Sequence, residues 1–408
     1  MPKPSRILVI SQVYVPDPAS VGQHMADAAE TLVKRGNRVR VLTSRRGYDD
    51  PSQRYAAREN RRGVEVVRLP LSSLGKRSIL VRIVAQLSFL LQATLRGLFT
   101  PGLGGIVVST SPPMASIAAI IIRFFRRAPI TFWVMDLNPD QVVATGRMKP
   151  TALAVRAMDW LNRRILGAAR VVVPLDRFMQ DRLCAKRAGV AQKCRVIPPW
   201  PMDGELQDVP PRSENPFVAQ HGLQHKRVIM YSGNHGLTTP VDALVEAALA
   251  LGADDRLHFM FIGGGPGKRP VDAAIESHKP SNLVSLPYQP LDQIRYSLPA
   301  ADVHVVLMAE ELVGVVHPCK IYGAMSVGKP ILFIGPAPSH ISEILELAPI
   351  GWRIPYGDVE QTMRVLNKIS SMPSEELEGM GARAKRLVTE HFSQQRLCGA
   401  FCDAVEGS

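Results

Sequence analysis

The feature that most constrains the fold of this chain is an alternation of short apolar runs with segments of helical spacing. The first example runs from an apolar strand at Arg6–Ser11, through a loop and a helix predicted at 23–34, to a second strand at 38–43. Strand, helix and strand in this order predict a parallel sheet covered by helices. The same alternation starts again at Arg227, after a proline-rich polar run.

This repetition predicts an α/β protein with two Rossmann-like parallel-sheet domains. A chain of 408 residues is too long for one ordinary core. Ligands of such sheets bind outside the carboxyl ends of the strands, so the predicted domains face a cleft that holds the site. The predicted boundaries are an N-terminal domain at 1–200, a linker at 201–225, a C-terminal domain at 226–388 and a last helix within 389–408.

The charge is divided between the two halves of the chain. Residues 1–200 carry 32 Lys and Arg against 12 Asp and Glu, a net charge of +20, and the remaining residues carry −7. A basic domain favours nucleic acid or an anionic membrane surface as its partner. Because no helix-turn-helix, zinc-finger or RNP motif occurs in the sequence, we expect no nucleic acid and favour the membrane.

One long apolar stretch, 78–99, could contact that membrane. It is interrupted by Arg82, Gln86, Gln92 and Arg96. An arginine near a bilayer centre costs about 2.5–3.5 kcal/mol, which disfavours a spanning helix. Two readings stay open, an amphipathic helix at the membrane surface and a core helix that covers the sheet.

The cysteine content and the start of the sequence bear on the compartment. The five cysteines have no paired spacing and form no metal-binding pattern, which favours a reducing compartment. Residues before Arg6 lead directly into a strand, so we expect no signal peptide. The expected location is the cytoplasm, peripheral on the inner membrane face.

The stretch from 303 to 334 is the strongest candidate for a ligand site. A buried strand is followed by Glu310 and Glu311, a loop closed by Pro318, and a helix of small residues that ends at Gly328. A helix start attracts anions, and Lys320 near that start adds a full charge. A surface turn with a solvated Lys320 is the alternative.

These residues resemble the donor-site signature of a known family. An acidic residue, Gly314-Val315-Val316 and then Pro318-x-Lys320-x-Tyr-x-Ala-Met-x-x-Gly-Lys-Pro330 is similar to the retaining bacterial glycosyltransferases of family 4, in the branch that builds surface polysaccharides. The resemblance implies a GT-B fold, with a nucleotide-sugar donor on the C-terminal domain and an acceptor on the N-terminal domain. It also implies that the C-terminal helix crosses back to the first domain.

The resemblance assigns roles to particular residues. Catalytic roles are implied for Asp136, Lys320 and Glu311, and neither a metal nor a cofactor is required besides the donor. The implied donor-binding residues are Gly22, Gly233, Asn234, His235, Gly264, Gly265, Lys268, Tyr288, Glu310, Val315, Val316 and Lys320.

Some departures from the family pattern concern the second Glu and the cations of the donor site. Cys319, or Gly323 when the alignment is shifted through Ala324 and Met325, stands where many relatives have a second Glu. Asn234 and Pro240 stand where they have the Arg and Lys that hold the donor diphosphate. Lys320, and after it Lys268, are therefore the expected cations. Without the second Glu, we expect front-face retention rather than a glycosyl-enzyme.

Asp136 follows a predicted strand, in a place where relatives have a similar acidic motif lining the acceptor site. A catalytic base, an acceptor-positioning group and a helix cap made by Asp136 or Asn138 all remain open.

The predicted activity is transfer of a sugar from a nucleotide-sugar to a lipid-linked or saccharide acceptor, such as a polyprenyl-diphosphate saccharide. The alternatives are an epimerase or phosphorylase of the same fold, or a non-catalytic membrane-bound scaffold.

Overall fold

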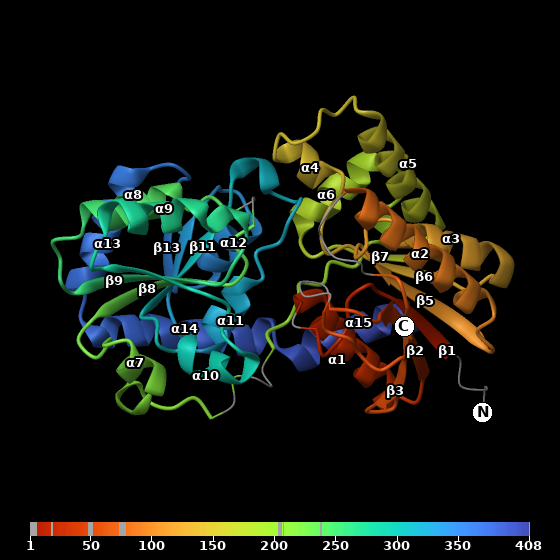
Figure 1. The fold of residues 1–408 in the computed structure, drawn as a ribbon, viewed down its shortest axis with the longest axis horizontal. Coiled ribbons are helices and arrows are strands. Elements are labelled where there is room, and N and C mark those ends of the chain that lie inside the picture. Colours follow the sequence, from red (N-terminus) through yellow and green to blue (C-terminus); the bar gives the residue numbers. More distant parts are fainter. Residues whose placement is uncertain are drawn as a thin grey trace. The chain divides into compact units, whose positions relative to one another are not determined.

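The chain forms two compact units, each described here by itself. The computed structural model describes residues 6–17, 19–47, 52–72, 79–202, 206, 208–236 and 239–407. Unit 1 consists of Met1–Pro199, Gly314–His317 and Gln395–Ser408, and unit 2 consists of Trp200–Val313 and Pro318–Gln394. Each unit is a sheet with helices packed on it (Figure 1).

Unit 1 is built on a seven-stranded sheet of order β3-β4-β2-β1-β5-β6-β7. All pairs are parallel except β3 with β4. The elements are β1 (Arg6–Ile10), α1 (Ser20–Lys34), β2 (Arg38–Ser44), β3 (Arg58–Arg61), β4 (Val64–Leu69), α2 (Ile79–Leu98), β5 (Leu103–Ser109), α3 (Ala115–Arg126), β6 (Ile130–Trp133), α4 (Asp140–Ala144), α5 (Leu153–Ala168), β7 (Val171–Val173), α6 (Arg177–Lys186) and α15 (Gln394–Glu406).

Unit 2 is built on a six-stranded, all-parallel sheet of order β10-β9-β8-β11-β12-β13. Its elements are α7 (Pro216–Gln220), β8 (Arg227–Ser232), α8 (Asp242–Ala250), β9 (Leu257–Ile262), α9 (Arg269–His278), β10 (Leu283–Leu286), α10 (Ile294–Ser297), β11 (Val303–Leu307), α11 (Lys320–Ser326), β12 (Ile331–Ile334), α12 (His340–Leu347), β13 (Gly351–Ile354), α13 (Val359–Ser371) and α14 (Ser374–His391).

Both sheets have the strand order of a doubly wound Rossmann fold, with β3 added at one edge of unit 1. In this order the chain reverses direction at the middle of the sheet, between β1 and β5 in unit 1 and between β8 and β11 in unit 2. Ligands of such sheets bind beyond the carboxyl ends of the strands at this point. The predicted α/β fold with two Rossmann-like sheets is therefore confirmed.

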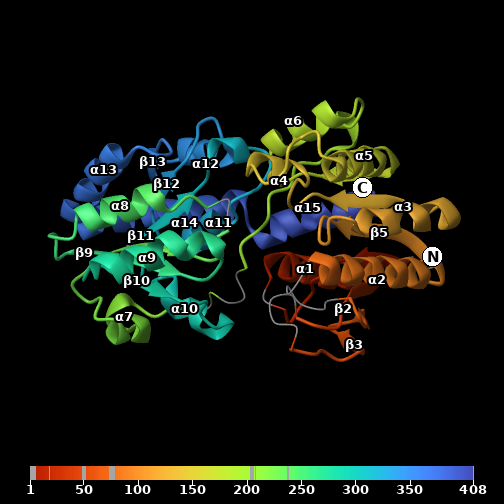
Figure 2. The same cartoon turned by 45° about the horizontal axis from the view of Figure 1, so that its top comes forward.

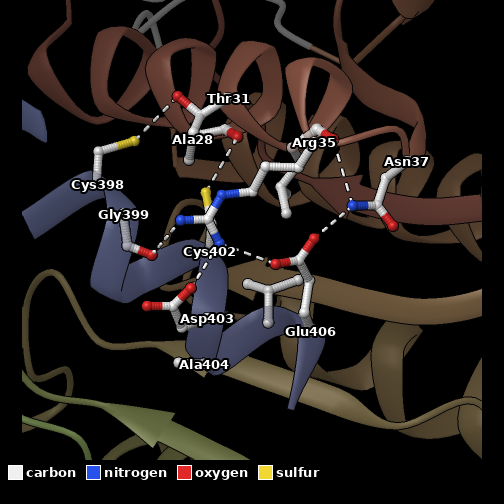
Figure 3. A network of polar contacts seen from close by, with 12 residues as sticks. Ala28, Thr31, Arg35, Asn37, Cys398, Gly399, Cys402, Asp403, Ala404 and Glu406 are labelled. Carbon is white, nitrogen blue, oxygen red and sulfur yellow. Dashed lines mark hydrogen bonds and ion pairs between the residues drawn. The ribbon is translucent and has the colours of Figure 1, made fainter. Parts of the chain in front are cut away.

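The helix α15, near the end of the chain, completes the core of unit 1. Phe401 is fully buried, and its ring lies 4.2 Å from that of Trp133 on β6, centroid to centroid. On the outer side, Arg35 donates to Asp403 at 2.6 Å and to Glu406 at 2.9 Å, as Figure 3 shows. The apolar contact supplies burial, and the ion pairs tie the helix to the end of α1.

The membrane-facing stretch predicted at 78–99 is mostly helix α2. It packs against α3, where a Cβ atom on Gly97 would lie 2.3 Å from Ile122 Cδ1, and Figure 2 shows the two helices in unit 1. Ser78 and the side chain of Arg82 lie outside the described residues. No helix in the described ranges has the length and hydrophobicity needed to cross a membrane.

Two segments differ from the sequence-based expectations. The edge strand β3 was not predicted, because its sequence Arg-Glu-Asn-Arg has no apolar alternation. The described part of the predicted linker is 201–202, 206 and 208–225, and in it Phe217, Val218 and Leu223 are buried in a small core of unit 2. Asn215 caps α7 by accepting from Phe217 N at 2.9 Å. Asn215 and Pro216 thus form the start of α7 within the predicted linker.

Phe401→Ala tests the role of α15. Removing a buried phenylalanine costs about 3–5 kcal/mol, so unit 1 should lose this much of its free energy of unfolding. Hydrogen exchange of the α1 and β6 amides measures unit 1 separately from unit 2. Phe124→Ala, at an exposed position in the same unit, is the matched control and should stay within about 0.5 kcal/mol of wild type. Similar small losses in both variants would contradict the packing role of α15.

Candidate active site

Two glycine loops of unit 2, after β8 and β9, are joined through their main chains. His235 N donates to Gly264 O at 2.9 Å, and Gly267 N donates to His235 O at 2.9 Å. A Cβ atom on Gly265 would lie 2.4 Å from His235 O, and one on Gly263 would lie 2.0 Å from Gly233 O. No larger residue fits without moving a backbone. The glycines thus have a packing role beside the predicted approach to phosphate.

Lys320 lies over the first of these loops. Its Nζ donates to Asn234 O at 3.0 Å and lies 4.3 Å from the ring centroid of Tyr231. The Tyr231 hydroxyl donates to the same Asn234 carbonyl at 2.8 Å, which fixes the acceptor. Burial lowers the pKa of Lys320 to about 8, so the group is still mostly charged at neutral pH. An ammonium has three donors, and Asn234 O is its one hydrogen-bond acceptor among the described residues.

The His235 side chain, in the same loop after β8, is fully buried. Its ring lies 4.5 Å from Tyr231 and 6.2 Å from Phe261, between centroids. Neither ring nitrogen has a well-formed hydrogen bond to the described residues. Burial, with the nearby charges of Lys320 and Lys268, lowers the pKa of His235 to about 4, against a smaller opposing effect of the Gly233 carbonyl. The imidazole is therefore neutral at physiological pH and supports the loop from below.

Lys268 and Tyr288 hold the second glycine loop. Lys268 is buried, and its Nζ donates to Gly263 O at 2.8 Å and also to Leu286 O. Its charge is thus directed at main-chain carbonyls in this structure. Tyr288 is exposed, with its hydroxyl 3.1 Å from Gly264 O and 3.3 Å from Asn234 Oδ1. An exposed aromatic ring beside the loops is placed where a base or sugar can contact it.

Glu310 and Glu311 follow β11 in a single 3-10 turn, and both side chains are exposed. They belong to the loop that starts at the switch point of the sheet in unit 2, as the sequence predicts. The helix α11 begins at Lys320 itself and has only seven residues. The positive charge at this point therefore comes from the Lys320 ammonium itself, and the dipole of so short a helix adds little to it.

The four residues after this turn, Gly314–His317, pack in unit 1. Leu137 N donates to Val315 O at 2.9 Å, and a Cβ atom on Gly314 would lie 2.5 Å from Phe178 O. Val315 is buried and Val316 half-buried, so these two predicted donor-site residues lie beside the segment that follows Asp136. Within unit 1, Gly314–His317 therefore pack beside the segment that follows Asp136.

His317 and Asp176 form a buried pair that sequence reasoning missed. His317 Nδ1 lies 2.8 Å from Asp176 Oδ2, and Asp176 Oδ1 accepts from Met179 N at 2.8 Å to cap α6. The two partners are 141 positions apart in the sequence. A histidine before Pro318 and an aspartate before a predicted helix were the available signals, and neither identified the partner.

Asp136 lies just beyond β6. Thr110 Oγ1, in the loop after β5, accepts from the backbone N–H groups of Met135 and Asp136 at 3.2 Å each. Burial raises the pKa of the Asp136 carboxyl to about 6, and the nearby His317 lowers it by a smaller amount. The helix-cap alternative is not observed, because α4 starts after Pro139 without a side-chain cap. Asp136 is thus a partly buried carboxylate that titrates close to neutral pH.

Gly22 lies in α1, where a Cβ atom would come within 3.0 Å of Tyr14 Cα. It lets the helix approach the loop that follows β1.

As for metals, the described residues contain no cluster of three or more His, Cys, Asp or Glu side chains that could hold an ion.

The two Rossmann-order sheets, each with candidate residues beyond the carboxyl ends of its strands, have the architecture of the GT-B fold. Solved structures of this class agree. The chain superposes on sucrose-phosphate synthase of Thermosynechococcus elongatus with a TM-score of 0.76, at 14% identity and over 99% and 98% of the two chains. For HepE of Anabaena in complex with UDP-glucose the TM-score is 0.73, at 14% identity and over 99% and 100%.

Sequence comparisons show similarity to glycosyltransferases. Residues 20–200 match the glycosyl transferase 4-like domain. The chain is 26% identical over 292 residues to the glycosyltransferase WbjE of Pseudomonas aeruginosa, covering 71% of this chain and 72% of that one. It is 24% identical over 360 residues to the colanic acid biosynthesis glycosyl transferase WcaI of Escherichia coli K12, covering 84% and 86%. Residues 20–200 are thus similar to the glycosyl transferase 4-like domain, and these similarities agree with the glycosyltransferase resemblance that the donor-site motif predicts.

Proposed function

We propose that the protein transfers a sugar from a UDP-sugar to a lipid-linked saccharide, with retention of configuration, during surface polysaccharide synthesis. The solved structure of HepE with UDP-glucose supports a uridine donor. The relative WcaI, named for colanic acid biosynthesis, supports the polysaccharide pathway. The basic residues 1–200 suit a diphosphate-bearing lipid acceptor at the inner membrane face.

The observation that carries the donor half of this proposal is the position of Lys320. Lys320 is the first residue of α11, which follows β11, and its Nζ donates to Asn234 O in the loop that follows β8. A departing diphosphate needs positive charge as its bond to the sugar breaks. Asn234 and Pro240 cannot supply it, and Lys268 is bonded to main-chain carbonyls. Lys320, with unused donors, is the group that fits this task.

The part of the proposal that concerns the acceptor rests on Asp136. A carboxylate with a pKa of about 6 is ionised at neutral pH and still basic enough to accept a proton or a strong hydrogen bond from a sugar hydroxyl. Val315, the residue bonded to Leu137, belongs to the same loop as Glu310 and Glu311. Retention proceeds on the front face, since Cys319 replaces the second glutamate of the family motif.

Epimerisation and phosphorolysis, two other activities of the same fold, need different reactants from transfer. Epimerisation needs no acceptor, and phosphorolysis needs inorganic phosphate. Incubating the protein with UDP-glucose and a polyprenyl-diphosphate saccharide in detergent should form a longer lipid-linked product. Turnover of the donor that is unchanged by removing the acceptor, or that needs inorganic phosphate, would exclude the proposed transfer. NMR of the product then reports the anomeric configuration.

Lys320→Ala tests the proposed diphosphate contact. Loss of a comparable transition-state donor costs about 2.7–4 kcal/mol, so kcat at saturating donor should fall about 100- to 1000-fold. Lys329→Ala, a half-buried lysine with a lowered pKa in the same unit, is the matched control and should keep wild-type turnover. If Lys320→Ala keeps more than about a third of the turnover, an effect below about 1 kcal/mol, another group holds the diphosphate.

Asp136→Asn tests the acceptor role through pH. If the ionised carboxylate is required, kcat/KM for the acceptor in the wild-type protein should fall about tenfold per pH unit below about pH 6. The variant should lose about 10²–10⁴-fold in transfer and should no longer show this acidic limb. Its affinity for UDP, measured by calorimetry, should match that of wild type. A well-folded variant that has lost UDP affinity would instead place Asp136 in donor binding.

A further inference from the structure

The outward face of α2 is apolar where a surface helix of a soluble domain is normally polar. Val84, Leu87, Leu91 and Leu95 follow one another at spacings of three and four residues, which places them in a single stripe, and all are exposed. Phe99, just after the helix, is 81% exposed. The opposite face, with Ala85, Phe89, Leu90 and Ala93, is buried in unit 1. We call the five exposed residues the α2 strip.

The end of α3 extends this surface. Arg126 Nη1 donates to Leu98 O, which joins the last turn of α3 to the last turn of α2. Phe124 and Phe125, in that turn of α3, are exposed and contact each other edge to face at 5.1 Å between centroids. Single exposed hydrophobic residues are ordinary, but a continuous group of this kind indicates a surface that is covered by a partner.

The charge around the α2 strip indicates what the partner is. From Val66 to Met135 the sequence contains eight Lys and Arg and neither Asp nor Glu. Arg96 on α2 and Arg127, directly after α3, are exposed, and Arg123 on α3 is half-buried. An exposed apolar face bordered by cations, with no anion, matches the boundary between lipid headgroups and acyl chains of an anionic bilayer.

A second copy of the chain fits this surface poorly. A two-fold dimer would bring the same patch of both subunits together. The arginines of one copy would then face those of the other without any carboxylate to pair with them. An anionic lipid surface supplies both the apolar layer and the missing negative charge.

We propose that the α2 strip and the Phe124–Phe125 pair insert into the headgroup region of an anionic membrane, and that Arg96, Arg123 and Arg127 contact lipid phosphates. This inference rests on the proposed function in one respect, because the membrane is where a lipid-linked acceptor resides. It names the surface of the protein that would bring the N-terminal unit to such an acceptor.

Liposome flotation without any donor or acceptor tests the inference separately from catalysis. The full chain should float with vesicles of phosphatidylglycerol and phosphatidylethanolamine, and binding should weaken as salt is raised. Leu91→Gln, at a position 62% exposed, should weaken binding about tenfold. Leu347→Gln, on α12 in unit 2 at a position 59% exposed, is the matched control and should bind as wild type does.

The double variant Arg123→Gln/Arg127→Gln tests the proposed contacts between arginines and lipid phosphates. Two cations near an anionic surface contribute about 1 kcal/mol each, so this variant should bind about thirtyfold more weakly. The control is Lys385→Gln/Arg386→Gln, two exposed cations of α14, which should have no effect. All variants should keep the circular dichroism spectrum and the thermal unfolding of the wild-type protein, which verifies their folding.

Equal binding of wild type and Leu91→Gln to the vesicles would overturn the proposal. So would a wild-type protein that is dimeric by analytical ultracentrifugation and becomes monomeric in Leu91→Gln, since the strip would then be a subunit interface. Flotation that fails while transfer to a detergent-solubilised acceptor persists would reject the docking surface and leave the transferase activity in place.

Discussion

The close main-chain contact between the loops after β8 and β9 is the constraint on which the candidate donor site depends. Gly263, Gly265 and Gly267 each leave out a Cβ atom that would collide with the Gly233–Gly236 segment. With the two loops in contact, the Asn234 carbonyl is held by Tyr231 and can anchor Lys320. Lys268 and the neutral His235 lie beneath the same loops and support them. The cation proposed for the diphosphate is thereby placed by packing that no single residue provides.

Much of the fold was predictable because the hydrophobic pattern of each segment indicates whether it is a strand or a helix. Buried strands such as Leu257–Ile262 are continuous apolar runs, and the helices between them have clear helical spacing. The glycine loops and Lys320 also stand out, since their sequence neighbours are strand ends. What could not be predicted depends on partners far along the chain. The contacts of His317 with Asp176 and of Leu137 with Val315 join segments that have no common pattern. The edge strand β3 is polar throughout, so only its pairing with β4 identifies it.

The reading of individual residues also changed once their contacts were known. Lys320 and, after it, Lys268 are both expected as diphosphate cations from the sequence, as lysines near a helix start and a glycine-rich segment. In the structure, Lys268 is buried on two carbonyls, whereas Lys320 has a single hydrogen-bond acceptor among the described residues. Asp136 is the opposite case. Its location after a strand was predictable, but burial near His317, which sets its pKa near 6, is a property of the folded unit alone.

The central claim is that Lys320 meets the donor diphosphate, and its lowered pKa offers a direct measurement. At pH 8, a lysine with a pKa of about 8 is half deprotonated, and a bound diphosphate would raise that pKa. Calorimetric titration of UDP at pH 8, in two buffers of different ionisation enthalpy, should therefore show uptake of up to about half a proton by the wild-type protein. Lys320→Met should take up none, while Lys329→Met should behave as wild type does. Proton uptake that is unchanged in Lys320→Met would show that another group meets the diphosphate and would contradict the account.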